Sequence, residues 1–165
     1  MSTEHSKSSM LNRIRTIADF QFGNGVGGAL FPDECEFRLS STRRIRYVML
    51  DGERLATVRA QDGRLTLGIT GAARLREALA PPAYRAVIME DVASFIAGGK
   101  NAFARHIIAA DPTIRAGDEV MVTTGDDELL GTGVAMLSGT EMLAFNYGVA
   151  VKLRQGREAL CYQET

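Results

Sequence analysis

The chain has 165 residues, 45% of them hydrophobic, so it is long enough to bury the core of one large domain or two small ones. Its formal net charge is −1 and its pI is about 6.1, which excludes the broadly basic surface of many nucleic-acid binders. No apolar run approaches the roughly 20 residues that cross a bilayer, and the polar start lacks the apolar centre of a signal peptide. We therefore expect a cytoplasmic protein.

The charges are unevenly divided along the chain. Residues 1–80 hold 12 Lys or Arg against 9 Asp or Glu, whereas residues 81–165 hold 7 against 11. Any surface that binds a polyanion must therefore be a local patch.

Catalytic and metal-binding side chains are scarce. A zinc site would have to combine Cys35, Cys161, His5 and His106, whose spacings fit no known ligand pattern. We therefore expect free thiols, no metal and no cofactor. With two histidines a nucleophilic triad is also poorly supplied. The carboxylates at Asp118-Glu119 and at residues 126–128 are more typical of solvated turns than of an acid–base pair, so we predict no catalytic residue.

The first elements along the chain are a helix and a glycine-rich segment. Between Ser9 and Phe20, apolar residues recur at helical spacing and predict a short amphipathic helix. The next segment holds a GxGxxG pattern, but that pattern holds a dinucleotide only between a strand and a helix. Here a helix precedes it, so we predict a loop that Phe22, Leu30 and Phe31 pin against a core.

Alternating residues from Cys35 to Leu67 predict a four-stranded antiparallel meander. Asp51-Gly52 and Asp62-Gly63 are strong hairpin signals, because the type I′ turn needs positive φ angles. One strand is expected to place Ile45, Tyr47 and Met49 on one face, with Arg44, Arg46 and Val48 on the other. The cations Arg43, Arg44 and Arg46 are secondary candidates for phosphate contacts, and a solvated arginine-covered face is an equally good interpretation.

A helix with Leu75 and Leu79 facing inward is predicted next. It is stopped by Pro81-Pro82, which we take as a domain boundary. A short buried strand over Arg85 to Met89 and a helix ending at Gly98-Gly99 follow. Another strand then leads to residue 110.

The last part of the chain, from Asp111 to Leu153, has the most specific pattern. Val120 and Val122 are expected on one face of a strand, and an Asp126-Asp127 turn leads into a return strand. The glycines of that strand, Gly131 and Gly133, suggest a bulge or a closely approaching backbone. Ser138 and Glu141 form a capping-box pattern for a short helix that turns Met142 and Phe145 inward, and a final strand follows.

The motifs RAGDEVMV, GTGVAMLSGTEM and GVAVK closely resemble the PUA domain, an RNA-binding module. With FGNGVGGALF and LDGERLATVRAQDGRLTL upstream, the chain resembles the C-terminal part of an archaeosine-type tRNA-guanine transglycosylase, without the catalytic barrel. The resemblance implies an α+β protein, with an antiparallel sheet and flanking helices over residues 8–80 and a PUA-type pseudo-barrel over residues 84–157. The nucleophile and zinc ligands of that family lie in the barrel and have no counterpart here.

The resemblance also implies an RNA surface around the glycine turn and the last strand, where small residues let a sugar-phosphate chain approach backbone N–H groups. The matching positions are Arg85, Gly98, Gly99, Lys100, Asn101, Phe103, Arg105, Arg115, Lys152 and Arg154. Gly98-Gly99 is also a plain helix cap, and Phe103 also suits a core.

The implied function is binding of RNA, most simply tRNA, in a transglycosylase system whose catalytic part is a separate chain. Two alternatives stay open from the sequence. One is a ribosome-assembly or translation factor, because PUA modules also occur there. The other is a protein-interaction adaptor, which the acidic second half makes conceivable.

Overall fold

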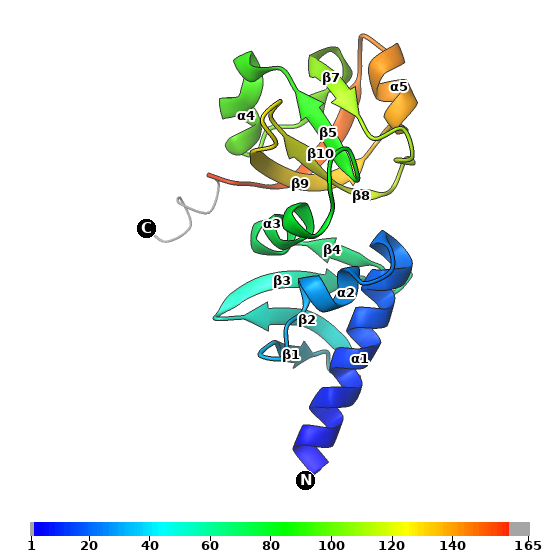
Figure 1. The fold of residues 1–165 in the computed structure, drawn as a ribbon, viewed down its shortest axis with the longest axis vertical. Coiled ribbons are helices and arrows are strands. Elements are labelled where there is room, and N and C mark those ends of the chain that lie inside the picture. The colour runs from blue at the N-terminus through cyan, green and yellow to red at the C-terminus, as the bar shows by residue number, and fades with distance from the viewer. Residues whose placement is uncertain (1, 159–165) are drawn as a thin grey trace. The chain divides into compact units, whose positions relative to one another are not determined.

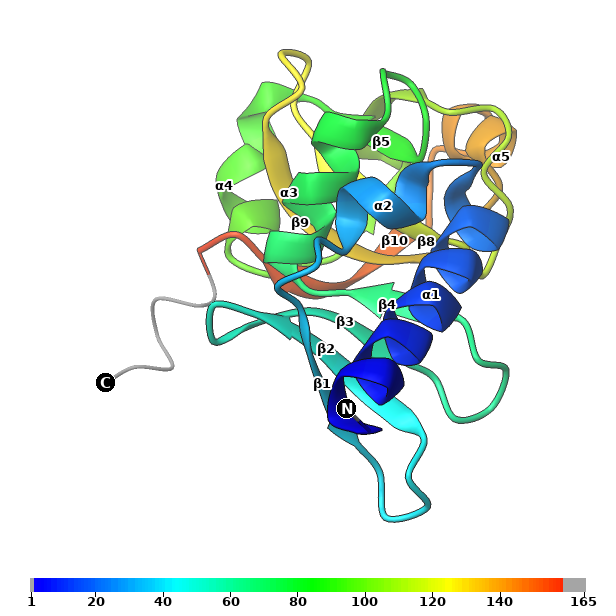
Figure 2. The ribbon, with the colours of Figure 1, turned by 60° about the horizontal axis from the view of Figure 1, so that its bottom comes forward.

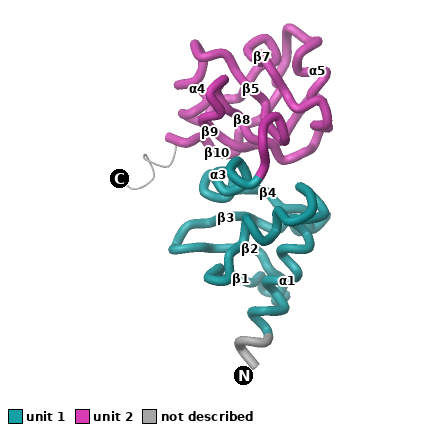
Figure 3. Tube along the Cα trace, in the orientation of Figure 1, with its two compact units in different colours: residues 1–78 teal, residues 79–165 magenta. Residues whose placement is uncertain are grey.

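A computed structural model describes the backbone of residues 2–158 and the side chains of residues 6–158. The side chains of His5 and Cys161, two of the four possible zinc ligands weighed above, lie outside the described residues. The chain divides into two compact units, residues 1–78 and residues 79–165 (Figure 3). Within the described residues, no helix combines the length and apolar character needed to cross a membrane.

The first unit pairs helices with a four-stranded sheet, in which neighbouring strands are antiparallel and follow the chain order (Figure 1). This confirms the predicted meander. Its elements are α1 (Ser2–Phe22), α2 (Val26–Leu30), β1 (Glu36–Leu39), β2 (Ile45–Leu50), β3 (Glu53–Val58), β4 (Leu65–Leu67) and α3 (Ile69–Ala78).

Helix α1 begins earlier than predicted, at Ser2 instead of Ser9, because its polar first turns carry no apolar periodicity to detect. Its core side follows the expected spacing, since Leu11, Ile14 and Ala18 are buried. Gln21 fixes the helix to the sheet: its amide donates to the Leu65 carbonyl at 2.9 Å and accepts from the Leu65 N–H at 2.8 Å.

The glycine-rich segment holds a short helix where we predicted a loop. Val26–Leu30 forms helix α2, and Gly27 lies so close to α1 that an added Cβ would be 2.2 Å from the Arg15 carbonyl oxygen. The Gly27 N–H donates to the Asp19 carboxylate at 2.7 Å. Phe22, Leu30 and Phe31 are buried as predicted. Close packing of α2 on α1 therefore depends on Gly27, which is not one of the GxGxxG glycines; a Cβ added to Gly25 or Gly28 would meet no atom within 4 Å.

The two predicted hairpin turns differ. Asp51 and Gly52 both have positive φ, 52° and 80°, as a type I′ turn requires. In the second turn Gly63 has φ 72° and Asp62 is not left-handed, so the prediction of a second type I′ turn is wrong. There the Asp62 carboxylate accepts the Arg64 N–H at 3.0 Å and supports a longer loop.

Strict alternation along β2 is also wrong. Ile45 and Val48 are both buried, although alternation puts them on opposite faces. In the register with β1, Leu39 is opposite Ile45 and Arg38 is opposite Tyr47, so a bulge lies between the two buried residues and turns the side chains on its two sides relative to each other.

The second unit is a six-stranded sheet in the order β6-β10-β9-β8-β5-β7, with β5 parallel to β8 and the other pairs antiparallel. Helices α4 and α5 lie at opposite ends of this unit (Figure 1). The elements are β5 (Arg85–Ile88), η1 (Glu90–Val92), α4 (Ala93–Ala97), β6 (Ala102–Phe103), η2 (Ala104–His106), β7 (Ile107–Ala110), β8 (Glu119–Thr123), β9 (Leu129–Ala135), α5 (Gly139–Ala144) and β10 (Val149–Gly156).

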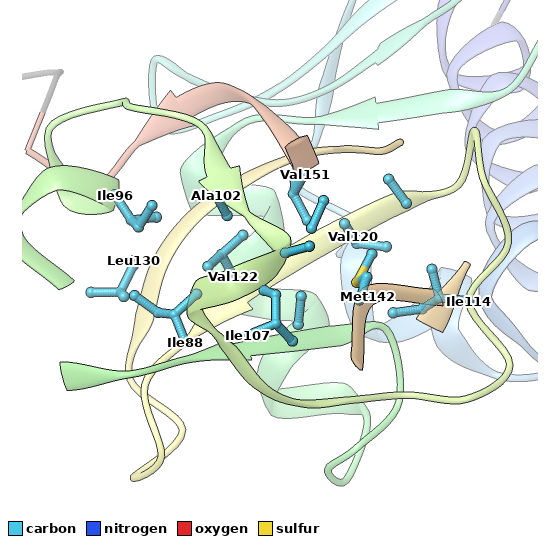
Figure 4. Close-up of a cluster of buried hydrophobic side chains, with 14 of the residues drawn as sticks. Ile88, Ile96, Ala102, Ile107, Ile114, Val120, Val122, Leu130, Met142 and Val151 are labelled. Carbon is cyan, nitrogen blue, oxygen red and sulfur yellow. The ribbon is translucent and has the colours of Figure 1, made fainter. Parts of the chain in front are cut away.

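The core of the second unit is one cluster of aliphatic side chains (Figure 4). It includes Val120 and Val122, as the alternation predicts, and Met142 from α5. The capping box is present, with Ser138 accepting the Glu141 N–H and the Glu141 carboxylate accepting the Ser138 N–H. The prediction for Phe145 is wrong, because it ends the helix in an extended conformation and is 38% exposed.

Candidate nucleic-acid interface

The glycine turn after α4 is a helix cap. The N–H of Gly98 donates to the Ser94 carbonyl at 3.1 Å, that of Gly99 to Ile96 at 2.9 Å and that of Lys100 to Phe95 at 3.0 Å. Gly99 has φ 98°, the left-handed conformation that glycine adopts without strain. These N–H groups already have partners inside the protein, so the turn contributes its shape, and the exposed side chain of Lys100 contributes the charge.

Asn101 joins this turn to the last strand. Its side-chain oxygen accepts the Leu153 N–H at 2.9 Å, next to Lys152. Ala102 pairs with Val151, and both point into the core (Figure 4). Because neighbours in a strand point to opposite faces, Asn101 and Lys152 point away from the core, and both are exposed.

Phe103 carries a cation on its ring. It is 39% exposed, and the Arg105 guanidinium lies 5.6 Å from the ring centroid, within the range of a cation–π contact. The ring of His106 meets Phe103 edge-on at 6.2 Å, and its Nε2 lies 3.3 Å from Arg105 Nε. Phe103 is therefore a half-exposed platform and not a core residue.

Five of the predicted residues thus lie in or beside the paired strands β6 and β10: Phe103 and Lys152 are in the strands, Lys100 and Asn101 directly precede β6, and Arg105 lies in η2, which follows it. We call this set the β6 surface; it consists of Lys100, Asn101, Phe103, Arg105 and Lys152. Within the described residues none of its three cations forms an ion pair with a carboxylate.

Arg154 follows this surface on β10 but is already paired. Its guanidinium makes a two-pronged contact with Glu119, at 2.5 and 2.9 Å. Glu119 is 5% exposed, and the Arg154 side chain is one-third exposed, at 33%. The pair is electrically neutral, so Arg154 adds little attraction for a phosphate.

Arg85 lies inside the fold. Its side chain is 1% exposed, and Nε and Nη2 donate to the two carboxylate oxygens of Asp127 at 2.6 and 3.1 Å. A third bond runs from Nη1 to the Ala83 carbonyl at 3.0 Å. We therefore assign Arg85 to the structure of the unit and not to its RNA surface.

Arg115 is exposed in the turn before β8, where its N–H donates to the Asp118 carboxylate at 2.9 Å. Its neighbour Ile114 and Ile96 of α4 lie at opposite ends of the core cluster (Figure 4). The secondary candidates Arg43, Arg44 and Arg46 belong to the first unit, at the start of β2, and all three are exposed.

Sequence reasoning missed the acidic partners. Asp127 and Glu119 were interpreted as solvated turn residues, and each instead binds a buried or half-buried arginine. Each ion pair joins residues at least 35 positions apart in the chain, so no local pattern reveals it. His106 was not predicted as part of the site. Its position directly after Arg105 in the sequence is only a weak signal of the contact between the two side chains.

The described residues hold no group of three His, Cys, Asp or Glu placed to bind a metal. Burial raises the pKa of the Cys35 thiol to about 11, with Arg74 and Arg15 opposing the shift. Such a thiol is protonated at neutral pH and is a poor nucleophile or ligand.

Both units match known families. Residues 12–82 match the model described as the patch-forming domain C2 of tRNA-guanine transglycosylase, and residues 84–157 match the PUA domain. The tRNA-guanine(15) transglycosylase of Pyrococcus furiosus is 48% identical over 145 residues, which cover 88% of this chain and 24% of that protein. The enzyme of the same name from Pyrococcus abyssi is 46% identical over 151 residues, 92% of this chain and 26% of the relative. The chain thus spans about a quarter of the length of these relatives, within their C-terminal part.

Solved structures show the same fold. A hypothetical protein from Pyrococcus horikoshii OT3 superimposes with a TM-score of 0.73 at 20% identity, covering 95% of each chain. A conserved PUA domain protein from Thermoplasma acidophilum gives a TM-score of 0.62 at 18% identity, covering 91% of this chain and 89% of that one.

Proposed function

Because the chain is a PUA-domain protein that resembles the C-terminal part of the tRNA-guanine(15) transglycosylases, we propose that it binds tRNA as the RNA-binding part of a tRNA-guanine transglycosylase system. Base exchange is then the work of a separate catalytic chain. The relatives are named for that reaction, and three quarters of their length has no counterpart here.

The β6 surface is the observation that carries this proposal. It offers three cations and an aromatic ring that carries the Arg105 guanidinium on its face. Two of the cations, Lys100 and Lys152, directly precede Asn101 and Leu153, which are joined by a hydrogen bond. Cations of this kind contact phosphates, and a half-exposed ring offers a face for a base. Carboxylates neutralise Arg85 and Arg154, so these two predicted cations add little to the attraction for RNA.

A small patch of this kind suits recognition of RNA by shape and backbone. If the three cations each neutralise one phosphate, log K falls with log salt with a slope of about −3, since each phosphate contributes roughly −0.9. Affinity should therefore be measurable at low salt and weak at 0.2 M.

Titration of fluorescently labelled, unmodified tRNA with the full chain tests the proposal. We expect the double variant Lys100→Glu with Arg105→Glu to bind about tenfold more weakly or worse, with a slope shallower by about two. Lys7→Glu with Arg13→Glu is the matched control, because it makes the same change in net charge on exposed positions of α1, and we expect it to stay within about twofold of the parent.

Two results would count against the proposal. One is no binding of tRNA by the parent protein at low salt. The other is equal weakening by the Lys7 and Arg13 control and the Lys100 and Arg105 variant, because the attraction would then be a general effect of net charge.

A further inference from the structure

Phe20, near the end of α1, has an aromatic ring that faces water. It is 93% exposed, more than any other large apolar side chain in the described part of the chain. The helical repeat of about 3.6 residues puts Phe20 on the side of α1 opposite to Leu11 and Ala18, which are buried. Folding of the first unit therefore leaves this ring uncovered.

A recess of about 350 Å³ lies beside the ring, between α1 and the β3–β4 loop. Figure 2 shows this loop running beside the helix, and two hydrogen bonds between Gln21 and Leu65 hold the helix against the sheet there. Single exposed apolar side chains are ordinary on protein surfaces, whereas a contiguous apolar patch marks an interaction site. The lining consists of Thr16, Ile17, Phe20 and Gln21 from α1 and residues 62–64 from the loop.

The charges in this lining are balanced. Asp62 and Arg64, both exposed, border the recess from the loop, and α1 adds no charged residue to it. Asp62 lies 3.5 Å from Arg59, and because both side chains are 38% exposed that ion pair is weak and leaves Asp62 able to meet a further cation. A polyanion gains little from a balanced lining. The partner that fits is an apolar surface with one charge of each sign.

We propose that a second copy of this chain covers the ring and the recess, in a two-fold symmetric dimer. A two-fold axis beside Phe20 sets each ring over the recess of the other copy and the two rings against each other. The same axis brings Asp62 of each copy to Arg64 of the other. The surface is thus complementary to itself, as a two-fold contact requires. It does not include the β6 surface, so the dimer goes beyond the proposed function and does not depend on it.

Sedimentation equilibrium of the full chain without RNA tests the dimer. A contact of this size is weak, so the average mass should rise from one chain towards two as the protein concentration increases from about 10 μM to about 1 mM. Phe20→Asp places a charge in the contact and should weaken association about tenfold or more. Phe95→Asp is the matched control, because Phe95 is 60% exposed in the second unit, and its mass curve should follow that of the parent.

A charge exchange gives a second readout, which a loss of folding cannot imitate. Arg64→Asp should weaken association several-fold, because it sets two carboxylates against each other across the contact. Adding Asp62→Arg should restore association, since the pair then re-forms with its signs reversed. Unfolding curves confirm that each variant folds.

A parent that stays monomeric over the whole concentration range would overturn the dimer. If that monomer instead bound a transglycosylase catalytic chain through Phe20, the surface would belong to that chain. Equal weakening by Phe20→Asp and Phe95→Asp, or no recovery in the charge exchange, would also overturn the proposed contact. Lys100→Glu with Arg105→Glu is expected to leave the mass curve unchanged, so failure of the dimer leaves the proposed function standing.

Discussion

Lys100 and Arg85 have the same charge and very different surroundings. Lys100 is exposed on a turn, where a phosphate can reach it, whereas Arg85 is 1% exposed and holds Asp127 with two hydrogen bonds. A buried charge without its partner is costly, so such a pair constrains the fold more than it serves binding.

Replacing Arg85 by methionine should therefore reduce stability and leave RNA affinity nearly unchanged. Arg85→Met removes the hydrogen bonds from the guanidinium to Asp127 and to the Ala83 carbonyl, and we expect a loss of about 3 kcal/mol in the free energy of unfolding. Urea denaturation followed by circular dichroism measures it. A loss under about 1 kcal/mol would show that the pair contributes little, since Asp127 is partly exposed.

Asp111 is a second residue whose charge serves the fold. Burial alone would raise the pKa of its carboxyl, but hydrogen bonds from the Tyr84 N–H at 2.8 Å, the Thr113 N–H at 2.9 Å and the Thr113 hydroxyl at 2.7 Å outweigh it and lower the pKa. The charged form is thus favoured in the folded state. Its stabilisation is present above the ordinary pKa of 3.8 and is lost as the pH falls through the lowered value.

Asp111→Asn should accordingly cost about 1 to 3 kcal/mol at pH 7, since the amide retains one acceptor oxygen instead of two. The difference in the free energy of unfolding between the parent and the variant should become smaller as the pH falls below about 4, because the Asp111 carboxylate of the parent is then protonated. Denaturation curves at pH 7, 5 and 3 measure both quantities. If the difference in the free energy of unfolding were the same at all three pH values, the charge of Asp111 would not be the cause of the stabilisation.

At the scale of elements, strands β9 and β10 approach so closely that side chains are excluded. A Cβ on Gly133 would lie 2.1 Å from the Lys152 carbonyl oxygen, and one on Gly131 would lie 2.9 Å from that of Gln155. This confirms the close backbone approach predicted from the glycines. The contact positions Lys152, so the β6 surface depends on it.

Gly133→Ala should push β10 away from β9, which we expect to lower the free energy of unfolding by more than about 2 kcal/mol and to weaken tRNA binding as Lys152 moves. Gly125→Ala is the matched control, because an added Cβ there meets no atom within 4 Å. Thermal unfolding and tRNA titration give the two readouts. Equal stability of both variants would mean that the strands separate without cost.

At the scale of the molecule, the chain spans about a quarter of the length of the transglycosylases that it matches, within their C-terminal part. Under the proposed function, this chain binds tRNA and a separate chain catalyses base exchange. This chain then only needs to raise the local concentration of tRNA near the catalytic chain. Such uniform binding lowers KM and leaves kcat nearly unchanged.

Adding this chain to a transglycosylase that lacks its own C-terminal part should therefore lower the KM for tRNA, by about tenfold if binding is as strong as proposed. Incorporation of labelled guanine into tRNA measures the effect. The Lys100→Glu and Arg105→Glu variant should fail to produce it. Guanine exchange by this chain alone, or no effect in the mixture, would contradict the division of labour.

Much of the fold could be predicted because its signals are local. The alternating strands, the Asp51-Gly52 turn, the capping box of Ser138 and Glu141, and the PUA motifs each need only a few neighbouring residues to specify them. Predictions failed where packing or pairing between elements overrode the local pattern, as at helix α2, where Gly27 lies against Arg15 of α1, and at the β2 bulge opposite β1.

The sequence by itself determined the two-family organisation and the list of candidate cations. Tertiary structure alone decided which of those cations stay available, since it set Asp127 against Arg85 and Glu119 against Arg154 and left Lys100, Arg105 and Lys152 without a carboxylate among the described residues. The physical reason is that the sequence specifies which residues are charged, whereas the electrostatic environment and solvent exposure of each charge depend on residues that are brought near it only by folding.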